Sequence, residues 1–476
     1  MAPEGAGGEE VVVNSPSSLE TLLKNGPLTE AQAVEIFQQG QEAVVFALLT
    51  LSAKALKEDS PAPSTPSGMI PPYQKPNRSA RKKRPGRKKG HPGSRRAAPL
   101  TIDQTITHPL THCPDCGSVV AKSCETRTRT TEDIPTGITP VVVQHIIERG
   151  YCSTCRKIVE APVPEALPKA TIGNHLLALS AWFHFGLGQT ISQIVAVLSC
   201  HLHFALTPGG LVQMWHRLAA ILYAWYEAIG EQAKNSHFLH ADETGWRVMG
   251  KTFWLWCFTN DRVTYYLIDH CRGSPVLKRF FSDAFSGTLI ADFWGAYNRL
   301  KVAARQVCFV HLFRELENVL LYKDPSGDWR VFYKKLRRLL RDSLRLRKKD
   351  GVSPEEFASA KKRFLSRLDE ILKASWQNKN AQRLVKRLRR HRNDLFTFLD
   401  HPDVPADNNH GEREIRPAVI IRKNILCNRS EQGAHTQAIL MSVYRTLKLR
   451  GHDPIKTIAQ ALATYINTGT LPPLPE

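Results

Sequence analysis

The sequence predicts a multidomain protein, α/β plus α, whose central part is a mixed β-sheet. Three segments between about residues 235 and 270 support this: HFLHADETGWRV, KTFWLWCFTN and RVTYYLIDH. They are rich in β-branched and aromatic residues and are separated by turn-like pairs, as in hairpin-linked strands. A helical pattern at about 275–285 then precedes the strand-like TLIADFWGAY, and QVCFVHLFRELENVLL reads as a strand running into a helix. Such alternation indicates a mixed sheet, and 476 residues give room for about three domains.

The charge of the chain indicates a polyanionic partner. Lys and Arg number 65 against 44 Asp and Glu, a formal charge of +21, and 42% of residues are hydrophobic. The hydrophobic content excludes a wholly disordered protein, and the basic excess favours nucleic acid. The sequence has no apolar run of about 18 residues, and MAPEGAGGEE is unlike a secretory signal. We therefore expect a cytoplasmic protein without a membrane partner.

The N-terminal part divides into two expected regions. Residues 1–59 combine a loose tail with a short helix that begins with a possible capping box, Thr29 and Gln32, and continues to about Lys57. This helix either mediates self-association or docks on the main body. Residues 60–100 form a Pro-rich, basic and disordered arm, with 11 Lys and Arg between 75 and 96. We expect DNA contacts from its cations, which include Lys82, Lys83, Arg84, Arg87, Lys88 and Lys89.

Residues 101–165 are expected to form a zinc ribbon. Two CxxC pairs, Cys113 with Cys116 and Cys152 with Cys155, place four thiolates as in a structural Zn²⁺ site. VVVQHIIERGY, between the pairs, is predicted to be a strand.

Residues 166–234 are predicted to be a helical, DNA-binding domain. TISQIVAVLS and LVQMWHRLAAIL are separated by a break at Thr207-Pro208-Gly209-Gly210. The pattern is compatible with a helix-turn-helix. A helical hairpin that only packs is an equal alternative.

The rest of the chain reads as a sheet domain divided by a helical insertion. The expected parts are 235–325 for the first part of the core, 326–400 for a basic helical insertion and 401–476 for the last part. The stretches 75–96, 334–349 and 361–392 carry net charges of 11, 8 and 10, so the remaining chain is net negative by 8.

Two aspartates are candidate metal ligands. Asp242 lies in the first strand and Asp292 at the end of the fourth, where a carboxylate is costly to bury unless a partner satisfies it. If strand four lies beside strand one, the two carboxylates face each other. A third acid would complete an oxygen-rich site for Mg²⁺ or Mn²⁺, and such ions can drive phosphodiester hydrolysis. The alternative to metal binding is a structural role, in which each aspartate accepts hydrogen bonds from backbone amides of a turn. Glu412, in NNHGEREIR, lies in what reads as the first turn of a helix.

Four blocks carry a family resemblance: DETGWRV, ADFWGAY, CFVHLFRE and DNNHGEREIRPAVIIRKN. They resemble the insertion sequence 66 family of transposases, and the basic arm, cysteine finger and helical region upstream occur in the same order in that family. The resemblance covers about residues 60–465. It implies a ribonuclease-H-like mixed-sheet catalytic core with a helical insertion, preceded by a zinc ribbon and a helix-turn-helix-like domain. It also implies that Asp242, Asp292 and Glu412 form a catalytic DDE triad.

Neighbouring residues extend this expected site. Glu315 is the second candidate for the third acid, whereas Glu414 cannot replace Glu412 because residues two apart on a helix face different directions. Cys308 is expected to be a buried thiol, with His311 and Arg314 near the acids. DNA phosphates are the expected partners of His311, Arg314, Arg413, Arg416, Arg422 and Lys423.

The expected function is therefore a bacterial, nucleoid-associated DNA transposase that cleaves element ends and joins them to target DNA. Synapsis of two ends favours a homodimer or higher oligomer, and the resemblance implies accessory proteins of the same element. Two alternatives stay open: an inactive or domesticated zinc-ribbon DNA-binding protein, and a two-metal nuclease of the same fold that does not join strands.

Overall fold

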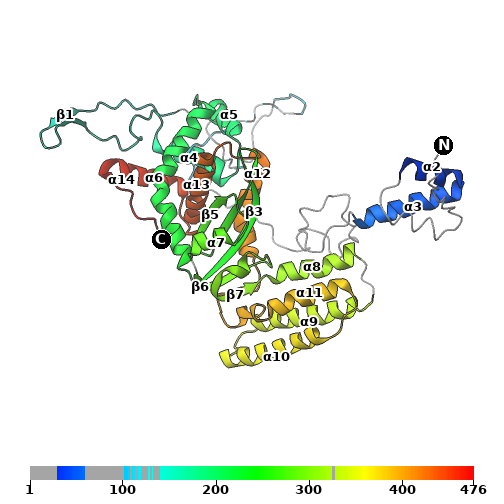
Figure 1. Cartoon of the computed structure of the whole chain (residues 1–476). Coiled ribbons are helices and arrows are strands. Elements are labelled where there is room, and N and C mark those ends of the chain that lie inside the picture. The colour runs from blue at the N-terminus through cyan, green and yellow to red at the C-terminus, as the bar shows by residue number, and fades with distance from the viewer. Residues whose placement is uncertain are drawn as a thin grey trace, which may run out of the picture. The chain divides into compact units, whose positions relative to one another are not determined.

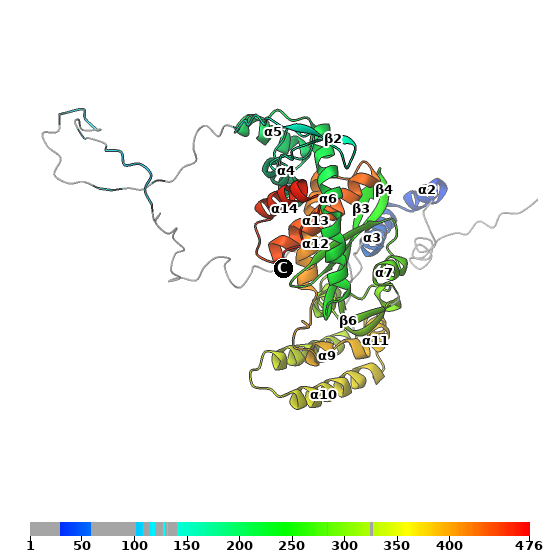
Figure 2. The same cartoon turned by 90° about the vertical axis from the view of Figure 1, so that its left-hand side faces the viewer.

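The computed structural model of the chain (Figure 1; Figure 2) consists of two compact units. The described residues are 29–58, 101–107, 110, 112, 115–119, 127–128, 131, 140–282, 284–323 and 327–476. One unit contains the sheet, together with residues 162–190 and everything from Val212 onward, and the other contains 77–161 and 191–211. The predicted basic arm and Cys113 lie outside the described residues. Among the described residues, none of the helices combines the length and the apolar character needed to cross a membrane.

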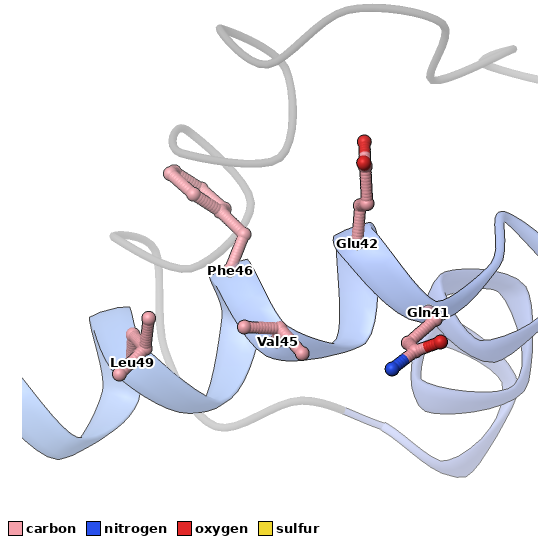
Figure 3. Close-up of a pocket in the computed structure, with 5 residues that line it drawn as sticks. All are labelled: Gln41, Glu42, Val45, Phe46 and Leu49. Atoms are coloured by element: carbon pink, nitrogen blue, oxygen red, sulfur yellow. The ribbon is translucent and has the colours of Figure 1, made fainter.

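Two helices form the N-terminal part, α2 (Glu30–Gln38) and α3 (Gln41–Glu58). The predicted capping box is confirmed, because the side chains of Thr29 and Gln32 each accept a backbone N–H of the other residue. Gly40, with φ of +96°, separates the two helices. A hollow of about 480 Å³ lies along α3 (Figure 3) and is lined by Gln41, Glu42, Val45, Phe46 and Leu49. It contains none of the predicted site residues.

The cysteine region contains a short antiparallel hairpin, β1 (Arg149–Cys152) and β2 (Lys157–Glu160). The prediction of a strand over VVVQHIIERGY is wrong for most of its length, because residues 141–148 pair with no strand among the described residues. Their apolar side chains are exposed and so lack the buried face that stabilises a strand. The hairpin instead contains the second cysteine pair. Cys152 is the last residue of β1, and Cys155 lies in the turn.

The central sheet has five strands in the order β5-β4-β3-β6-β7. Two antiparallel hairpins join β3 (Phe238–Val248), β4 (Lys251–Thr259) and β5 (Thr264–Asp269), as predicted. β6 (Ala284–Ala291) pairs in parallel with β3, and β7 (Lys301–Val307) pairs in parallel with β6. The fourth strand thus lies beside the first, which is the condition under which the two aspartates were expected to face each other. Gly287 makes this approach possible, since a Cβ there would lie 2.7 Å from the backbone oxygen of His237.

Helices cover both faces of the sheet. α7 (Ser274–Phe281) supplies Phe280, whose ring stacks on Phe258 of β4 with centroids 4.4 Å apart. α12 (Asn409–Ile425) and α13 (Glu431–Leu449) contact strands β3, β4 and β5. On their face, Tyr266 of β5 donates its hydroxyl hydrogen bond to the backbone oxygen of Glu414. The acid-bearing helix α12 is therefore fixed directly to the sheet.

The helices before the sheet are α4 (Asn174–Ala181), the π-helix η2 (Trp182–Gly186), α5 (Ile191–Leu202) and α6 (Pro208–Lys234). The predicted break at 207–210 is misplaced: Pro208, Gly209 and Gly210 form the first turn of α6, and the Thr207 hydroxyl accepts the N–H of Gly210 at 3.1 Å. Proline suits a first helical turn because its missing N–H has no partner there.

The long helix α6 packs within the sheet unit. Trp225 donates from its indole to the oxygen of Pro472 at 2.7 Å, and Tyr226 donates to the oxygen of Tyr266 at 2.8 Å. Leu218 and Leu222 are fully buried. This favours the alternative in which α6 serves packing, since a recognition helix must present its side chains to a groove. α14 (Pro454–Thr468) contacts α4 and completes this part of the unit.

A helical bundle follows β7. It comprises α8 (Phe309–Tyr322), α9 (Trp329–Arg347), α10 (Pro354–Lys373) and α11 (Lys379–Arg390), and α9, α10 and α11 lie side by side in Figures 1 and 2. Fully buried residues such as Trp329, Phe332 and Leu340 form its apolar core, which continues to Ile290 and Val307 of the sheet. The basic residues of these helices therefore stand on a well-packed scaffold.

Candidate active site

Asp242 and Asp292 lie at the same level of two neighbouring parallel strands. β3 pairs with β6 with an offset of 50 residues, from Phe238 with Thr288 to His240 with Ile290. Asp242 and Asp292 have the same offset and lie two residues beyond the last pair, with Asp292 directly after β6. Both side chains are half-buried. The Asp292 carboxylate accepts the backbone N–H of Trp294 at 2.8 Å, and that of Asp242 accepts the N–H of Glu243 at 2.9 Å.

The environment of these acids disfavours their negative charge. Burial raises the pKa of Asp242 well above its usual range, and the carboxylates of Glu243, Asp292 and Glu412 raise it further. Burial also raises the pKa of Asp292, while the N–H of Trp294 and the cations Arg272 and Arg387 oppose this rise. Acids that raise one another's pKa at a sheet edge need a cation to be ionised together.

Glu412 reaches this edge from the first turn of α12, as predicted. Asn408, the residue directly before α12, anchors the start of this helix and is 1% exposed. Its amide donates to the backbone oxygen of Ala241 at 3.0 Å, and its carbonyl oxygen lies 2.8 Å from His240 Nδ1. Its backbone N–H donates to Cys308 Sγ at 3.2 Å. Asn408 therefore joins the start of α12 to β3 and to the start of α8.

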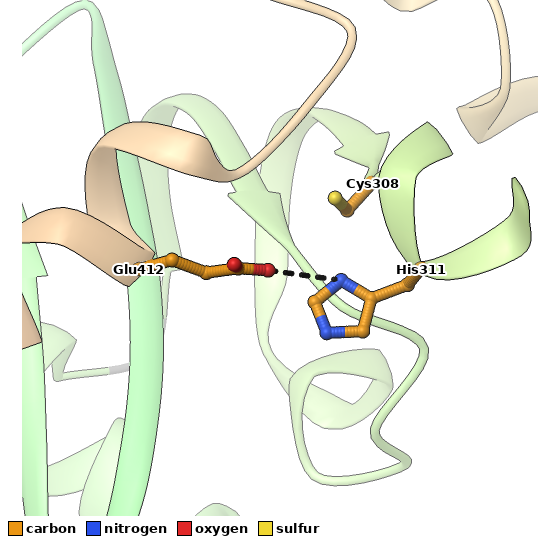
Figure 4. A group of neighbouring side chains, drawn as sticks. All are labelled: Cys308, His311 and Glu412. Carbon is orange, nitrogen blue, oxygen red and sulfur yellow. Dashed lines mark ion pairs between the residues drawn. The ribbon is translucent and has the colours of Figure 1, made fainter. Parts of the chain in front are cut away.

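The Glu412 carboxylate faces His311 and Arg314 of α8. Figure 4 draws Glu412 pointing toward His311, with Cys308 beside them. Glu412 Oε1 lies 3.7 Å from His311 Nδ1 and 3.7 Å from an Arg314 guanidinium nitrogen. These contacts exceed hydrogen-bond length, and both Oε1 and Nδ1 are buried without a hydrogen-bond partner. An unsatisfied buried carboxylate oxygen is a suitable cation ligand.

Cys308 is a buried thiol, in agreement with expectation. Burial raises its pKa to about 12, so it stays protonated near neutral pH. Burial also lowers the pKa of His311, which favours its neutral ring. The ligand atoms of Cys308, His311 and Glu412 lie within 4.8 Å of one another. A neutral thiol contributes little to such a site, because thiolate is the form that binds metal.

The other acids considered from sequence have partners of their own. Glu315, on α8, is buried and forms ion pairs with Arg383 and Arg387 of α11. Glu414 is buried and forms an ion pair with Arg445 of α13 at 2.7 Å. Both acids tie helices together, whereas the charge of Glu412 raises the pKa of Asp242 and of Asp292.

Sequence reasoning missed a network next to the aspartates. Glu243 is buried and accepts hydrogen bonds from Arg272, at 3.0 Å, and from the hydroxyl of Tyr297, at 2.6 Å. The Arg272 charge lowers the pKa of Asp292. The sequence DETGWRV places Glu243 directly after Asp242. Because successive side chains of a strand point to opposite faces of the sheet, Glu243 could have been expected to need buried partners of its own.

The predicted DNA-contacting cations of α12 differ in their surroundings. Arg413, Arg416 and Lys423 are exposed. Arg422 is half-buried and donates to the hydroxyl of Thr244 at 2.9 Å and to the backbone oxygen of Gly245. Its guanidinium therefore holds α12 against β3, whereas the other three cations face solvent.

Three of the four predicted zinc ligands lie among the described residues. The backbone N–H of Cys155 donates to Cys152 Sγ at 3.4 Å, and these contacts lower the pKa of Cys152. Cys116 lies between His112 and Val119, which form an isolated antiparallel bridge. The turn at Cys152 favours a thiolate, the form that Zn²⁺ requires.

Three carboxylates from β3, the end of β6 and the start of α12 thus define a candidate divalent-cation site on a mixed α/β sheet. Their hard oxygens match the ligand preference of Mg²⁺ or Mn²⁺. Comparison with known proteins agrees with this class. The family model described as "Transposase IS66 family" matches residues 169–436, and the chain belongs to this family.

Two individual proteins are also similar to this chain. The uncharacterized protein y4hP of Sinorhizobium fredii is 23% identical over 401 residues, which are 76% of this chain and 72% of that protein. The uncharacterized protein y4qI of the same organism is 29% identical over 265 residues, and the matched part spans about half of each chain, 49% here and 48% there.

Proposed function

We propose that this protein is a DDE transposase that cleaves the ends of a mobile element and joins them to target DNA. The observation that carries the proposal is the nearness of Asp242 to Asp292 and Glu412, whose negative charges raise its pKa, within a chain of the IS66 transposase family. The strand order, with three antiparallel strands followed by two parallel ones, supports a ribonuclease-H-like core.

The three carboxylates would hold Mg²⁺ or Mn²⁺, and the unsatisfied Oε1 of Glu412 supports this assignment. When bound, such ions activate an attacking oxygen and stabilise a leaving oxygen. First, a water oxygen bonds to phosphorus as a phosphodiester bond at the element end breaks, which frees a 3′-hydroxyl. That hydroxyl then bonds to a target phosphorus and displaces one target-strand oxygen. Asp242 and Asp292 would hold the ions beside the reacting phosphate.

Exposed cations would bind the DNA backbone around this phosphate. Arg413, Arg416 and Lys423 stand on the same helix as Glu412 and face solvent. His311 and Arg314 are close enough to Glu412 to contact a phosphate bound there. The basic arm and the cations of α9 to α11 would follow flanking DNA by charge neutralisation. Arg422 supports the site from within.

The cysteines at 113, 116, 152 and 155 would hold a structural Zn²⁺. The support is the Cys152–Cys155 turn, in which a backbone N–H donates to a thiol sulfur. Zinc content of the purified protein tests this assignment. A homodimer or higher oligomer would bring two element ends together, with accessory proteins of the element and double-stranded DNA as partners in the bacterial nucleoid.

Strand cleavage and strand transfer test the catalytic proposal. The substrate is a DNA fragment bearing the sequences that flank the gene, with Mg²⁺ and a target plasmid. We expect Asp242→Asn, Asp292→Asn and Glu412→Gln each to lower both reactions by about 10²–10³-fold or more. Glu317→Gln is the control and should keep full activity, because the Glu317 carboxylate pairs with Arg337 and Tyr333 of α9.

The outcomes separate the alternatives. Cleavage without joining by the wild-type protein would indicate a nuclease of the same fold. DNA binding without either reaction would indicate an inactive or domesticated DNA-binding protein. Full activity in Asp242→Asn would contradict the metal site itself.

A further inference from the structure

Trp294 differs from every other tryptophan of the chain. Of the nine tryptophans, all within the described part of the chain, six are buried and two are half-buried, whereas Trp294 is 39% exposed. It follows Asp292 by two residues, and its backbone N–H donates to the Asp292 carboxylate at 2.8 Å. The one exposed indole of the protein is therefore attached directly to a residue of the acid cluster.

The indole of Trp294 is held in a fixed stack. The guanidinium of Arg272 lies 4.1 Å from the Trp294 ring centroid and 4.3 Å from that of Trp254. Arg272 is itself held by Glu243 at 3.0 Å, and the Trp294 indole N–H donates to the backbone oxygen of Arg272 at 3.4 Å. The planar groups of Trp254, Arg272 and Trp294 thus follow one another, with buried Glu243 fixing the middle one.

The stack leaves a prepared surface on Trp294. Arg272 lies over its ring, and the side chain of Trp294 nevertheless stays 39% exposed. A rigid, exposed aromatic face costs little conformational entropy when a second planar group binds to it. Nucleobases are the planar groups that accompany a scissile phosphate, and they stack on aromatic side chains with little sequence preference.

We propose that Trp294 is a binding platform for a nucleobase that is unpaired from the duplex, next to the phosphate held by the acids. The inference rests on the proposed function, because DNA at the acids brings the base to Trp294. The base must be unpaired because duplex bases are already stacked on their neighbours on both sides. Trp294 binds the base and fixes its position. Its backbone hydrogen bond to Asp292 keeps the bound base next to the acids.

A fluorescence binding assay tests the platform. The full-length protein, without added Mg²⁺, is titrated into a short synthetic duplex with a single bulged 2-aminopurine and into the fully paired duplex. We expect tighter binding and quenched fluorescence for the bulged probe. Trp294→Ala should weaken binding of the bulged probe by about 10- to 100-fold while leaving the paired probe unchanged. Trp294→Phe should keep most of the preference.

Two further variants keep the test decisive. Tyr223→Ala removes another aromatic that is 39% exposed, on α6, and should bind both probes as the wild type does. If Trp294→Ala folds poorly, Trp294→Leu retains apolar volume without a stacking face and should lose the same preference. An unchanged preference for the bulged probe in folded Trp294→Ala or Trp294→Leu, or equal binding of both probes by the wild type, overturns the platform.

The binding assay and the cleavage assay test the two proposals independently. Loss of the bulge preference in Trp294→Ala supports the platform even if no strand cleavage is found. Conversely, cleavage that depends on Asp242 and Asp292, together with an unaffected preference in Trp294→Ala, removes the platform and leaves the transposase proposal intact.

Discussion

Glu315 and Glu412 represent two ways of keeping an acid inside this protein. Glu315, on α8, is 3% exposed and is neutralised by Arg383 and Arg387 of α11. Glu412, at the start of α12, has cationic neighbours only at 3.7 Å and keeps a buried oxygen without a hydrogen-bond partner. One buried oxygen of each acid lacks a hydrogen-bond partner, but that of Glu315 is in direct ion-pair contact with Arg383, whereas the cations nearest to Glu412 lie 3.7 Å away. The weaker charge pairing of Glu412 is what marks it as a candidate ligand rather than a structural contact.

The largest effect on stability is expected at Glu315. Glu315→Gln should lower the free energy of unfolding by about 3 kcal/mol, because the guanidinium groups of Arg383 and Arg387 lose the buried carboxylate with which they form ion pairs. Urea unfolding measures the change. The matched Glu412→Gln should leave stability within about 1 kcal/mol of wild type while removing activity. Equal destabilisation by the two substitutions would erase the distinction between these acids.

A smaller loss is expected at Asn408, which joins the two regions. Asn408→Ala removes the hydrogen bond to the oxygen of Ala241 and the contact with His240. We expect about 2 kcal/mol of destabilisation, since buried partners are left unsatisfied. Activity should fall more than stability explains, because Glu412 loses its anchor. Thermal unfolding and cleavage at a temperature where the variant is folded measure the two effects. Asn409→Ala, one residue later, is the control.

The smallest expected effect has the opposite sign. Asp242→Asn should stabilise the metal-free protein by about 1 kcal/mol, because it replaces an acid whose ionisation the folded protein disfavours with a side chain that does not ionise. The raised pKa of Asp242 means that the folded protein retains a proton which the unfolded chain releases above about pH 4. The free energy of unfolding of the wild type therefore falls as the pH rises through this range, and that of the variant falls less. Melting curves at several pH values in metal-free buffer measure this. A lower melting temperature for the variant at neutral pH would contradict it.

Much of the sheet and the position of its acids could be predicted from sequence. Strand and turn patterns predicted the hairpins before Asp269, and the position of Asp292 at a strand end followed from where its apolar run stopped. The contacts made by Asn408, Arg272 and Tyr297 could not be predicted, because they join residues far apart in the chain. The strand predicted before Cys152 was mostly wrong, because apolar alternation alone supplies no pairing partner. The start of α6 was misplaced because glycines in a first turn resemble a linker.

The origin of the three acids in separate parts of the chain determines when a newly made protein can act. Asp242 lies on β3 and Asp292 directly after β6, but Asn408 and Glu412 come only at the start of α12, after the whole bundle from α8 to α11. Synthesis proceeds from the N-terminus, so a growing chain contains the aspartates long before it contains their third partner. Under the proposed function, a ribosome-bound or prematurely terminated chain that ends before α12 cannot cut DNA. The order of the sequence thereby reserves cleavage for chains that have been translated almost to the end.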